Sequence, residues 1–179
     1  MSVRPLHLLG SPVLREKARA VGAPTAETAA FVQDLFDTMR AAEGVGLAAN
    51  QVGLAERVAV VDTHEGEPIV LIDPEILERY GRERGEEGCL SIPGTNLYGD
   101  VDRATRIVIA TTTLDGERVQ LEVLDHRARA VQHEIDHLDG VLFIDHLSPL
   151  KRRMLLRRWE KQRKGKSGYL QMPALAEGG

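Results

Sequence analysis

Cysteine and aromatic residues are scarce in this chain, and each scarcity excludes a class of protein. A single cysteine, Cys89, occurs among 179 residues, so no disulfide can form within the chain and a disulfide-stabilised secreted scaffold is excluded. Phe, Trp and Tyr make up 4% of the residues, so Leu, Ile, Val and Ala must supply most of the buried surface. There is no apolar run of membrane-spanning length and no secretory apolar region near Met1. We therefore expect a cytoplasmic protein with no membrane partner.

Charge is unevenly distributed along the chain. The net charge is −4, yet residues 151–179 contain nine of the 23 basic side chains and only two of the 27 acidic ones. The length suits one domain, so we expect residues 1–179 to form a single unit. Ser148 and Pro149 are typical first residues of a helix and predict a basic C-terminal helix over 149–164, with a frayed tail over 167–179.

Apolar spacing predicts the other elements. Pro24 and Thr25 are residues that commonly begin a helix, and Gly44 is a natural end to it. Asp115-Gly116 is a dipeptide typical of hairpin turns. Residues 82–87 are dense in charge and predict a loop. The β-branched runs that predict strands are 57–62, 69–73, 107–113 and 118–124.

The pattern His-Glu-x-x-His occurs at residues 133–137. On a helix, His133 and His137 stand one turn apart on one face and can bind one metal ion. Glu134 lies about 100° round the helix from His133, where it can reach a water on that metal without ligating it. We expect this helix to begin near Asp125 and to end at Gly140. A surface helix with inert histidines is the alternative, because the pentapeptide alone also recurs by chance. The apolar residues expected on the opposite side are Val131, Ile135 and Leu138.

A catalytic metal site needs three protein ligands and one open position for water. Cys89 is the only thiol, but a free cysteine is more often a small buried apolar residue than a ligand. The 27 acidic side chains are rival third ligands. Likewise, the glycine-rich segment 44–53 could let a backbone approach closely or could be a flexible hinge. The residue pattern leaves both questions open.

Three separated segments together resemble the signature motifs of the peptide deformylases. They are residues 44–51 (GVGLAANQ), 87–91 (EGCLS) and 132–140 (QHEIDHLDG), in this order along the chain. The similarity extends from about Leu14 to Leu150. It implies an α+β fold in which antiparallel strands wrap around a central metal-binding helix, with an N-terminal and a C-terminal helix outside. The chain departs from the family pattern at residues 125–127 (DHR), which makes one edge of the methionine pocket more polar than the pattern implies.

The resemblance implies a metal-dependent hydrolase that removes the formyl group from the N-terminal formyl-methionine of newly synthesised proteins. Cys89, His133 and His137 would bind one divalent metal ion, with Fe²⁺ expected as the native ion and Zn²⁺, Ni²⁺ or Co²⁺ possible. Glu134 would be the acid/base that takes a proton from water and passes it to the leaving amine. The partners implied are formyl-methionyl nascent peptides.

The same resemblance assigns the groups that surround the reacting carbonyl. Gln51 and the backbone N–H of Leu90 would form the oxyanion hole, because a developing oxyanion needs hydrogen-bond donors at a fixed place. These two residues and Gly46 would also bind the substrate backbone. Gly88 and Gln132 fit support roles around the site.

Two other functions compete with this interpretation. A metallopeptidase of the His-Glu-x-x-His type would cut peptide bonds, but such enzymes generally complete the site with Glu or His rather than with a residue like Cys89. A structural metal site in a binding module would need a fourth protein ligand, whereas the motifs offer three ligands and a carboxylate.

The basic C-terminal segment suggests a partner. We expect part of the helix to pack on the body and its basic residues to form a stripe. The candidate packing residues are Leu150, Met154, Leu155, Leu156 and Trp159. Such a stripe could be a solvated face that only aids solubility. The charge asymmetry favours docking on ribosomal RNA through phosphate contacts, without sequence-specific recognition of nucleic acid. The resemblance supports this, because some deformylases are thought to dock through this helix.

Overall fold

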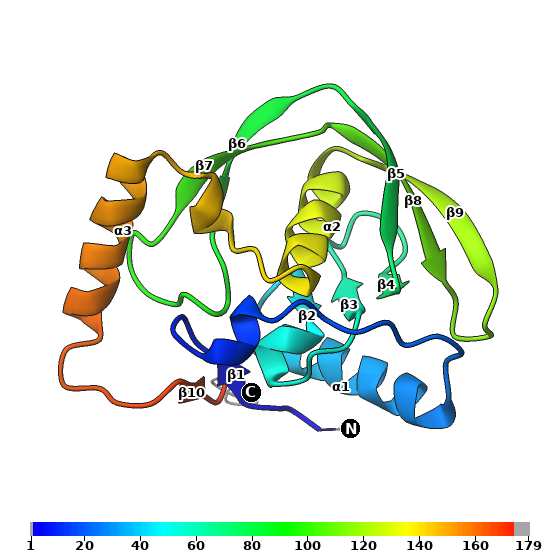
Figure 1. The fold of residues 1–179 in the computed structure, drawn as a ribbon, viewed down its shortest axis with the longest axis horizontal. Coiled ribbons are helices and arrows are strands. Elements are labelled where there is room, and N and C mark those ends of the chain that lie inside the picture. The colour runs from blue at the N-terminus through cyan, green and yellow to red at the C-terminus, as the bar shows by residue number, and fades with distance from the viewer. Residues whose placement is uncertain (1, 174–179) are drawn as a thin grey trace.

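The computed structural model describes residues 2–173, and within them the chain has an α+β fold of helices and small antiparallel sheets (Figure 1). The α-helices are α1 (Ala26–Ala41), α2 (Asp125–Leu138) and α3 (Pro149–Gln162). The strands are β1 (Leu6–His7), β2 (Gly46–Ala48), β3 (Val58–Val61), β4 (Ile69–Ile72), β5 (Glu75–Tyr80), β6 (Glu83–Glu87), β7 (Gly99–Arg103), β8 (Arg106–Thr112), β9 (Arg118–Leu124) and β10 (Leu170–Gln171). Short 3-10 turns η1 (Pro12–Arg15), η2 (Ala49–Val52) and η3 (Phe143–His146) connect them.

The sheet β2-β3-β4 separates α1 from α2. Every residue of β3 is buried, so neither face of this strand is exposed to solvent. Side chains of a strand alternate between its faces. Ala59 and Val61 accordingly join the core around α2, whereas Val58 and Val60 join the core formed with α1. The two strands predicted from the runs 57–62 and 69–73 are thus confirmed as β3 and β4.

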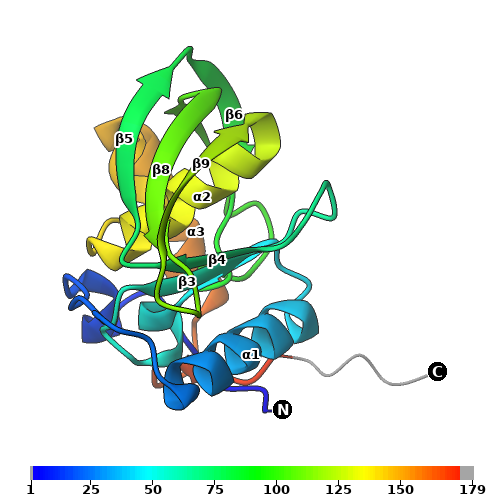
Figure 2. The ribbon, with the colours of Figure 1, turned by 90° about the vertical axis from the view of Figure 1, so that its right-hand side faces the viewer.

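A second sheet, β5-β8-β9, covers another side of α2 (Figure 2). The predicted hairpin is confirmed: β8 and β9 pair in register from Arg106↔Leu124 to Thr112↔Arg118. Gly116 in the turn has φ 87°, a left-handed conformation that costs glycine little.

Helix α2 therefore lies between two sheets. Its residues Val131, Ile135 and Leu138 are buried among side chains of β3, β4, β8 and β9, as the sequence predicted. Removing this apolar stripe from water stabilises the helix within the fold, since an isolated helix of this length would be marginal. The opposite face of α2 is left for the polar residues of the His-Glu-x-x-His pattern.

The structure predicted for residues 82–87 was wrong. Residues 82–87, expected to be a charged loop, contain strand β6, which pairs with β7 from Glu83↔Arg103 to Glu87↔Gly99. This two-stranded sheet leaves one side exposed, so charged side chains of β6 remain solvated or meet partners of opposite charge, as Arg84 meets Asp102. High charge density is therefore compatible with a strand here.

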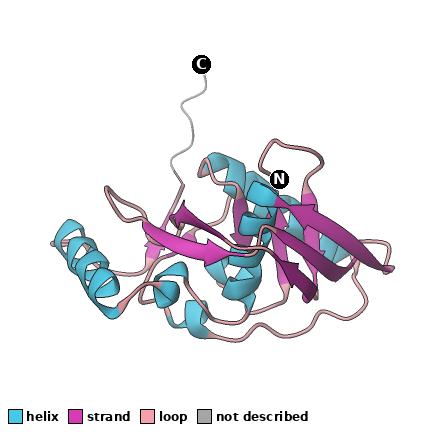
Figure 3. Ribbon diagram, turned by 90° about the horizontal axis from the view of Figure 1, so that it is seen from above, coloured by secondary structure: helices cyan, strands magenta, loops and turns pink. Residues whose placement is uncertain are grey.

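The C-terminal helix α3 lies at one end of the molecule (Figure 3). Leu155 and Trp159 are buried in a core with η3. Leu150 and Met154 are 64% and 45% exposed, so the expected packing of these two residues was wrong. The expectation of fraying from residue 167 also fails in part, because β10 pairs with β1; residues 174–179 lie outside the described part of the chain. No helix among residues 2–173 is long and apolar enough to cross a membrane.

Candidate active site

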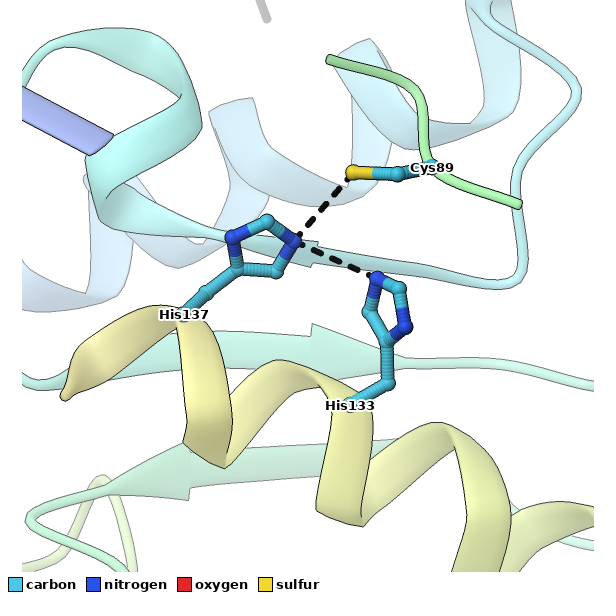
Figure 4. Close-up of side chains that lie close together, drawn as sticks. All are labelled: Cys89, His133 and His137. Carbon is cyan, nitrogen blue, oxygen red and sulfur yellow. Dashed lines mark hydrogen bonds between the residues drawn. The ribbon is translucent and has the colours of Figure 1, made fainter. Parts of the chain in front are cut away.

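Three side chains from two distant segments meet at one point (Figure 4). Helix α2 supplies His133 and His137, and the loop that follows β6 supplies Cys89. The His137 Nε2 atom lies 3.2 Å from His133 Nε2 and 3.3 Å from Cys89 Sγ. One potential ligand atom from each residue lies within 4.8 Å of the other two. Of the candidate third ligands that the residue pattern left open, the structure thus brings the thiol to the histidines.

This spacing fits a divalent transition-metal ion. With metal–nitrogen distances of ~2.0–2.1 Å and a metal–sulfur distance of ~2.3 Å, tetrahedral ligand atoms lie about 3.3–3.6 Å apart. The two contacts of His137 Nε2, at 3.2 and 3.3 Å, are close to that range. Two imidazoles and a thiolate form a donor set that several first-row metals accept. The residues present therefore fit a bound divalent cation.

The surroundings of the histidines also favour a cation. Burial lowers the pKa of His137 well below its usual value and keeps the imidazole neutral, which is the form that ligates a metal. Burial acts in the same direction on His133, but hydrogen bonds with Cys89 and Glu87 outweigh it and raise the pKa of His133 well above its usual value. Positive charge is thus favoured at this point. The Nδ1 atom of His133 lies 2.9 Å from Glu87 Oε1, which directs the other ring nitrogen toward the cluster.

Glu134 lies beside the cluster with its carboxylate buried. Burial raises the pKa of Glu134 to about 7, close to neutral pH, where a carboxyl group can both accept and release a proton. Its Oε2 atom has no hydrogen-bond partner within residues 2–173. Gly46 of β2 packs against this carboxylate, and a Cβ at Gly46 would come within 2.5 Å of Glu134 Oε1. A glycine at position 46 is therefore required for the observed position of Glu134.

Two N–H donors, the side-chain amide of Gln51 and the backbone N–H of Leu90, face the same space. The N–H of Ala48 donates to Gln51 Oε1 (3.0 Å), which leaves the Gln51 amide nitrogen 3.6 Å from Cys89 Sγ and 3.2 Å from Ser91 Oγ. The backbone N–H of Leu90 forms no hydrogen bond within the described part of the chain. An amide side chain and a backbone N–H are thus available to a ligand near the cluster.

Gln132 and Gly88, the two residues expected to support the site, both lie against its neighbouring segments. Gln132 pairs with the backbone of Ala104, accepting its N–H (3.1 Å) and donating to its carbonyl (2.9 Å) and to that of Ala128 (3.0 Å). This pairing fixes α2 against the connection between β7 and β8. Gly88 lies under the ring of Tyr98, where an added Cβ would come within 2.6 Å of the ring.

A buried ion cluster behind His133 was missed by the sequence analysis. Glu87 accepts hydrogen bonds from Arg103 at both oxygens (2.9 Å each) and from Arg129 (2.8 Å). Burial alone would raise the pKa of Glu87, but the hydrogen bonds from Arg103 and His133 hold it far below its usual range. Arg103 also donates to Asp136 (2.6 Å). The position of Glu87 at the start of a signature motif was the only signal, because the arginines belong to no motif.

The cluster opens into a cavity of about 430 Å³. Of the polar residues 125–127, only His126 lines this cavity; Arg127 turns away and donates to the Glu67 carbonyl (2.7 Å). The site residues predicted from the sequence that line it are Gly46, Gln51, Gly88, Cys89, Leu90, His133 and Glu134. All three signature segments therefore contribute to one cavity.

Comparisons with known proteins agree with this arrangement. The family model described as polypeptide deformylase matches residues 3–153. The peptide deformylase of Acidobacterium capsulatum is 44% identical over 168 residues, and that of Xylella fastidiosa strain M12 is 46% identical over 169 residues; each alignment covers 92% of this chain and 98% of the relative. The crystal structure of a peptide deformylase from Legionella pneumophila gives a TM-score of 0.84 at 37% identity, covering 93% of this chain and all of that one. The peptide deformylase from Thermus thermophilus gives 0.81 at 40% identity, covering 89% and 99%. Because the family match spans every segment that builds the cavity, this chain belongs to the polypeptide deformylase family.

Proposed function

We propose that this protein removes the formyl group from the N-terminal formyl-methionine of newly synthesised polypeptides. The observation that carries the proposal is the convergence of residues 44–51, 87–91 and 132–140 on one cavity around Cys89, His133 and His137. The reaction is hydrolysis of an N-formyl amide to formate and a free amino terminus. The substrates are formyl-methionyl nascent chains, so we place the protein in the cytoplasm.

Cys89, His133 and His137 would hold a divalent metal ion, and we propose Fe²⁺ as the native one. A divalent cation bound there would supply a Lewis acid that lowers the pKa of water toward neutral and polarises a carbonyl oxygen. Zn²⁺, Ni²⁺ and Co²⁺ suit the same donors, so the ion present in the cell depends on availability as well as on affinity. Anaerobic purification, with metal content and deformylase rate measured on one sample, tests the assignment. Full activity with zinc alone and no iron in the anaerobic preparation would contradict it.

Glu134 acts as the acid/base in this proposal. Its buried Oε2 has no partner among residues 2–173 and accepts one proton from the water that attacks the formyl carbon. When the bond between carbon and nitrogen breaks, the same oxygen returns that proton to the amine. A pKa near 7 suits both transfers. Gly46, whose lack of a side chain leaves room for this carboxylate, also binds the substrate backbone.

Gln51 and the Leu90 N–H stabilise negative charge on the formyl oxygen in the transition state. Gln51 is held by the Ala48 N–H, and Leu90 follows a metal ligand directly, so neither donor needs to reorganise during the reaction. Loss of one such donor typically lowers the rate about 10²–10³-fold. A formyl carbon carries only hydrogen, so close approach to this crowded cluster favours formyl over bulkier acyl groups.

The deciding experiment compares formyl-Met-Ala-Ser with unformylated Met-Ala-Ser. We expect formate release from the first peptide and no cleavage of the second. Cleavage of an internal peptide bond would instead support the rival metallopeptidase. Tight metal binding without turnover of either peptide would support a structural site.

We further propose that residues 1–179 form one catalytic domain that docks on the ribosome through α3. Among the nine basic residues between Lys151 and Lys166, only Arg152 forms a salt bridge within the described part of the chain, with Asp145 at 3.4 Å. The helix is held to the body by Leu155 and Trp159, which leaves the remaining charge on its outer surface. RNA phosphate is a suitable partner for such a surface.

A further inference from the structure

The loop that joins the segment 87–91 to strand β7 meets the cavity at two places. Pro93 and Gly94 line the cavity where the loop leaves it, and Tyr98 lines it where the loop returns. We call these three residues the loop rim, because Gly94 and Tyr98 are exposed and so lie at the mouth of the cavity. Residues 95–97 connect the two places without lining the cavity. Whatever holds residues 95–97 therefore also sets the position of the loop rim.

A glutamine of α3 holds the backbone of this loop. Residues 93–98 form no backbone–backbone hydrogen bond within the described part of the chain. Instead, the side-chain amide of Gln162 accepts the N–H of Thr95 at 2.9 Å and donates to the Thr95 carbonyl at 2.7 Å. A primary amide can satisfy both groups because, like a peptide unit, it has one acceptor oxygen and a donor nitrogen. The loop accordingly lies beside α3 (Figure 1).

The residues on either side of Thr95 fit this contact with α3. Gly94 has φ 147°, and a Cβ there would collide with Gln162 Oε1, so glycine leaves the space that the amide occupies. Leu97 is 1% exposed and belongs to the same buried apolar cluster as Trp159 of α3. Trp159 precedes Gln162 by three residues, so the two side chains share one face of the helix. One face of α3 thus supplies both an apolar and a polar anchor for the loop.

We propose that Gln162 is a positioning residue, which holds the loop on α3 and so fixes the loop rim that the substrate chain passes as it leaves the cavity. The inference rests on the proposed deformylase function. The formyl end reacts beside Cys89, so the residues after methionine must leave through the mouth of the cavity, where Gly94 and Tyr98 lie. A loop that is already held in place loses less conformational freedom when a peptide binds. Gln162 therefore strengthens the binding of peptides that extend beyond methionine and takes no part in the chemical step.

The first test compares formyl-Met-Ala-Ser with formyl-methionine amide, which ends before the loop rim. Gln162→Leu keeps most of the side-chain bulk but removes both hydrogen bonds, so KM for the tripeptide should rise about threefold to tenfold, the effect of losing roughly one net hydrogen bond. The value of kcat for the tripeptide, and kcat/KM for the amide, should stay within about twofold of wild type. Lys161→Leu is the matched control, because its exposed side chain forms no salt bridge within the described part of the chain. An equal fall of kcat/KM on both substrates, or an unchanged KM for the tripeptide, would overturn the proposal.

The second test observes the loop without the reaction. Amide hydrogen exchange at Thr95 should be about tenfold or more faster in Gln162→Leu than in wild type or Lys161→Leu, because this N–H has no other partner within residues 2–173. Exchange at Leu155 should be the same in all three proteins, which shows that α3 stays folded. Equal exchange at Thr95 in wild type and Gln162→Leu would overturn the proposal. Wild type inactive on both formyl substrates would refute the deformylase function itself, a result distinct from an unchanged KM in an active variant.

Discussion

At the scale of single residues, the site depends on a missing side chain as much as on those present. Gly46 faces Glu134, and any Cβ would contact the carboxylate at 2.5 Å. We predict that Gly46→Ala displaces the Glu134 carboxylate and lowers kcat about 10²-fold, since acid/base catalysis contributes roughly that much or more. Metal content should stay unchanged, because the ligands lie on α2 and in the loop after β6.

A double mutant separates this effect from lost substrate contacts. In a Glu134→Gln background, Gly46→Ala should cause little further loss of kcat, because both changes remove the same function. Independent, multiplying losses in the two variants would show that Gly46 acts through the substrate backbone alone.

Glu134 itself gives a second prediction. Glu134→Gln should retain the metal and lose about 10²–10⁴ of kcat, because an amide cannot carry a proton between water and amine. Single-turnover assays on a metal-replete sample, with metal measured in parallel, check this. A near-normal rate would exclude Glu134 as the acid/base.

At this scale, local motifs decide which site residues can be predicted from the sequence. Cys89, His133 and His137 lie in short signatures, and the structure brings all three together as predicted. Arg103 and Arg129 escaped prediction because an arginine has no local pattern that names its partner. Their pairing with Glu87 depends on tertiary contacts between β6, β7 and α2.

At the scale of elements, the presence of a β-branched apolar run decided which strands were predicted. β3 (VAVV) and β8 (RIVIATT) are rich in β-branched residues and were predicted correctly. β6 has no apolar run, and its pairing with β7 is supported by Arg129, which bonds to carbonyls of both strands. β1 and β10 are two residues each and join opposite ends of the chain, so no local signal could reveal them.

The turn η3 gives a prediction about pH. Asp145 receives hydrogen bonds from Arg15 (2.6 and 3.1 Å) and from the Leu142 N–H (3.0 Å), which joins the N-terminal segment to the chain after α2. Burial acts to raise the pKa of Asp145, but these hydrogen bonds hold it below the ordinary 3.8. Because the pKa is lower in the folded state, this carboxylate stabilises the fold above pH 3.8, and the contribution disappears as pH falls through the lower folded value.

Asp145→Asn should therefore cost about 1 kcal/mol of unfolding free energy at pH 6.5 and progressively less below pH 3.8. Urea unfolding of the metal-free protein between pH 3 and 6.5 measures this without a contribution from metal loss. Asp115→Asn, in the exposed β8–β9 turn, is the control and should cost little at any pH. A cost for Asp145→Asn that does not change with pH would contradict the assignment.

At the scale of the whole molecule, the site exists because α2 is enclosed. The sheet β2-β3-β4 lies between α2 and α1, and the sheet β5-β8-β9 covers another side of α2. The apolar face of α2 is therefore buried along its length (Figures 1 and 2). The face left over meets β2, which carries Gly46, and the loop that carries Cys89. Three segments far apart in sequence thus form one cavity because both sheets pack on the same helix.

Charge is segregated at the same scale. The basic residues of α3 lie at one end of the molecule, whereas the body is acidic. Arg153, Arg157 and Lys161 follow each other at steps of four, so they form a stripe along one side of α3, and Lys164 lies in the turn just after the helix. All four are exposed, and none forms a salt bridge within residues 2–173.

We predict that reversing these four charges to Glu weakens binding to ribosomes about tenfold or more and removes most of its salt dependence, because fewer phosphate counterions are then released on binding. Turnover of formyl-Met-Ala-Ser should stay near normal, since α3 contributes no residue to the cavity. Co-sedimentation with ribosomes in about 50 and 200 mM salt measures the effect. The matched control reverses Lys17, Arg19 and Arg79, which are exposed, lie outside α3 and form no salt bridge within the same part of the chain. Weakening by both sets in proportion to the four and three charges that they reverse would mean that net charge alone governs binding. Unchanged affinity of the α3 variant in low salt would leave the stripe as a solvated face.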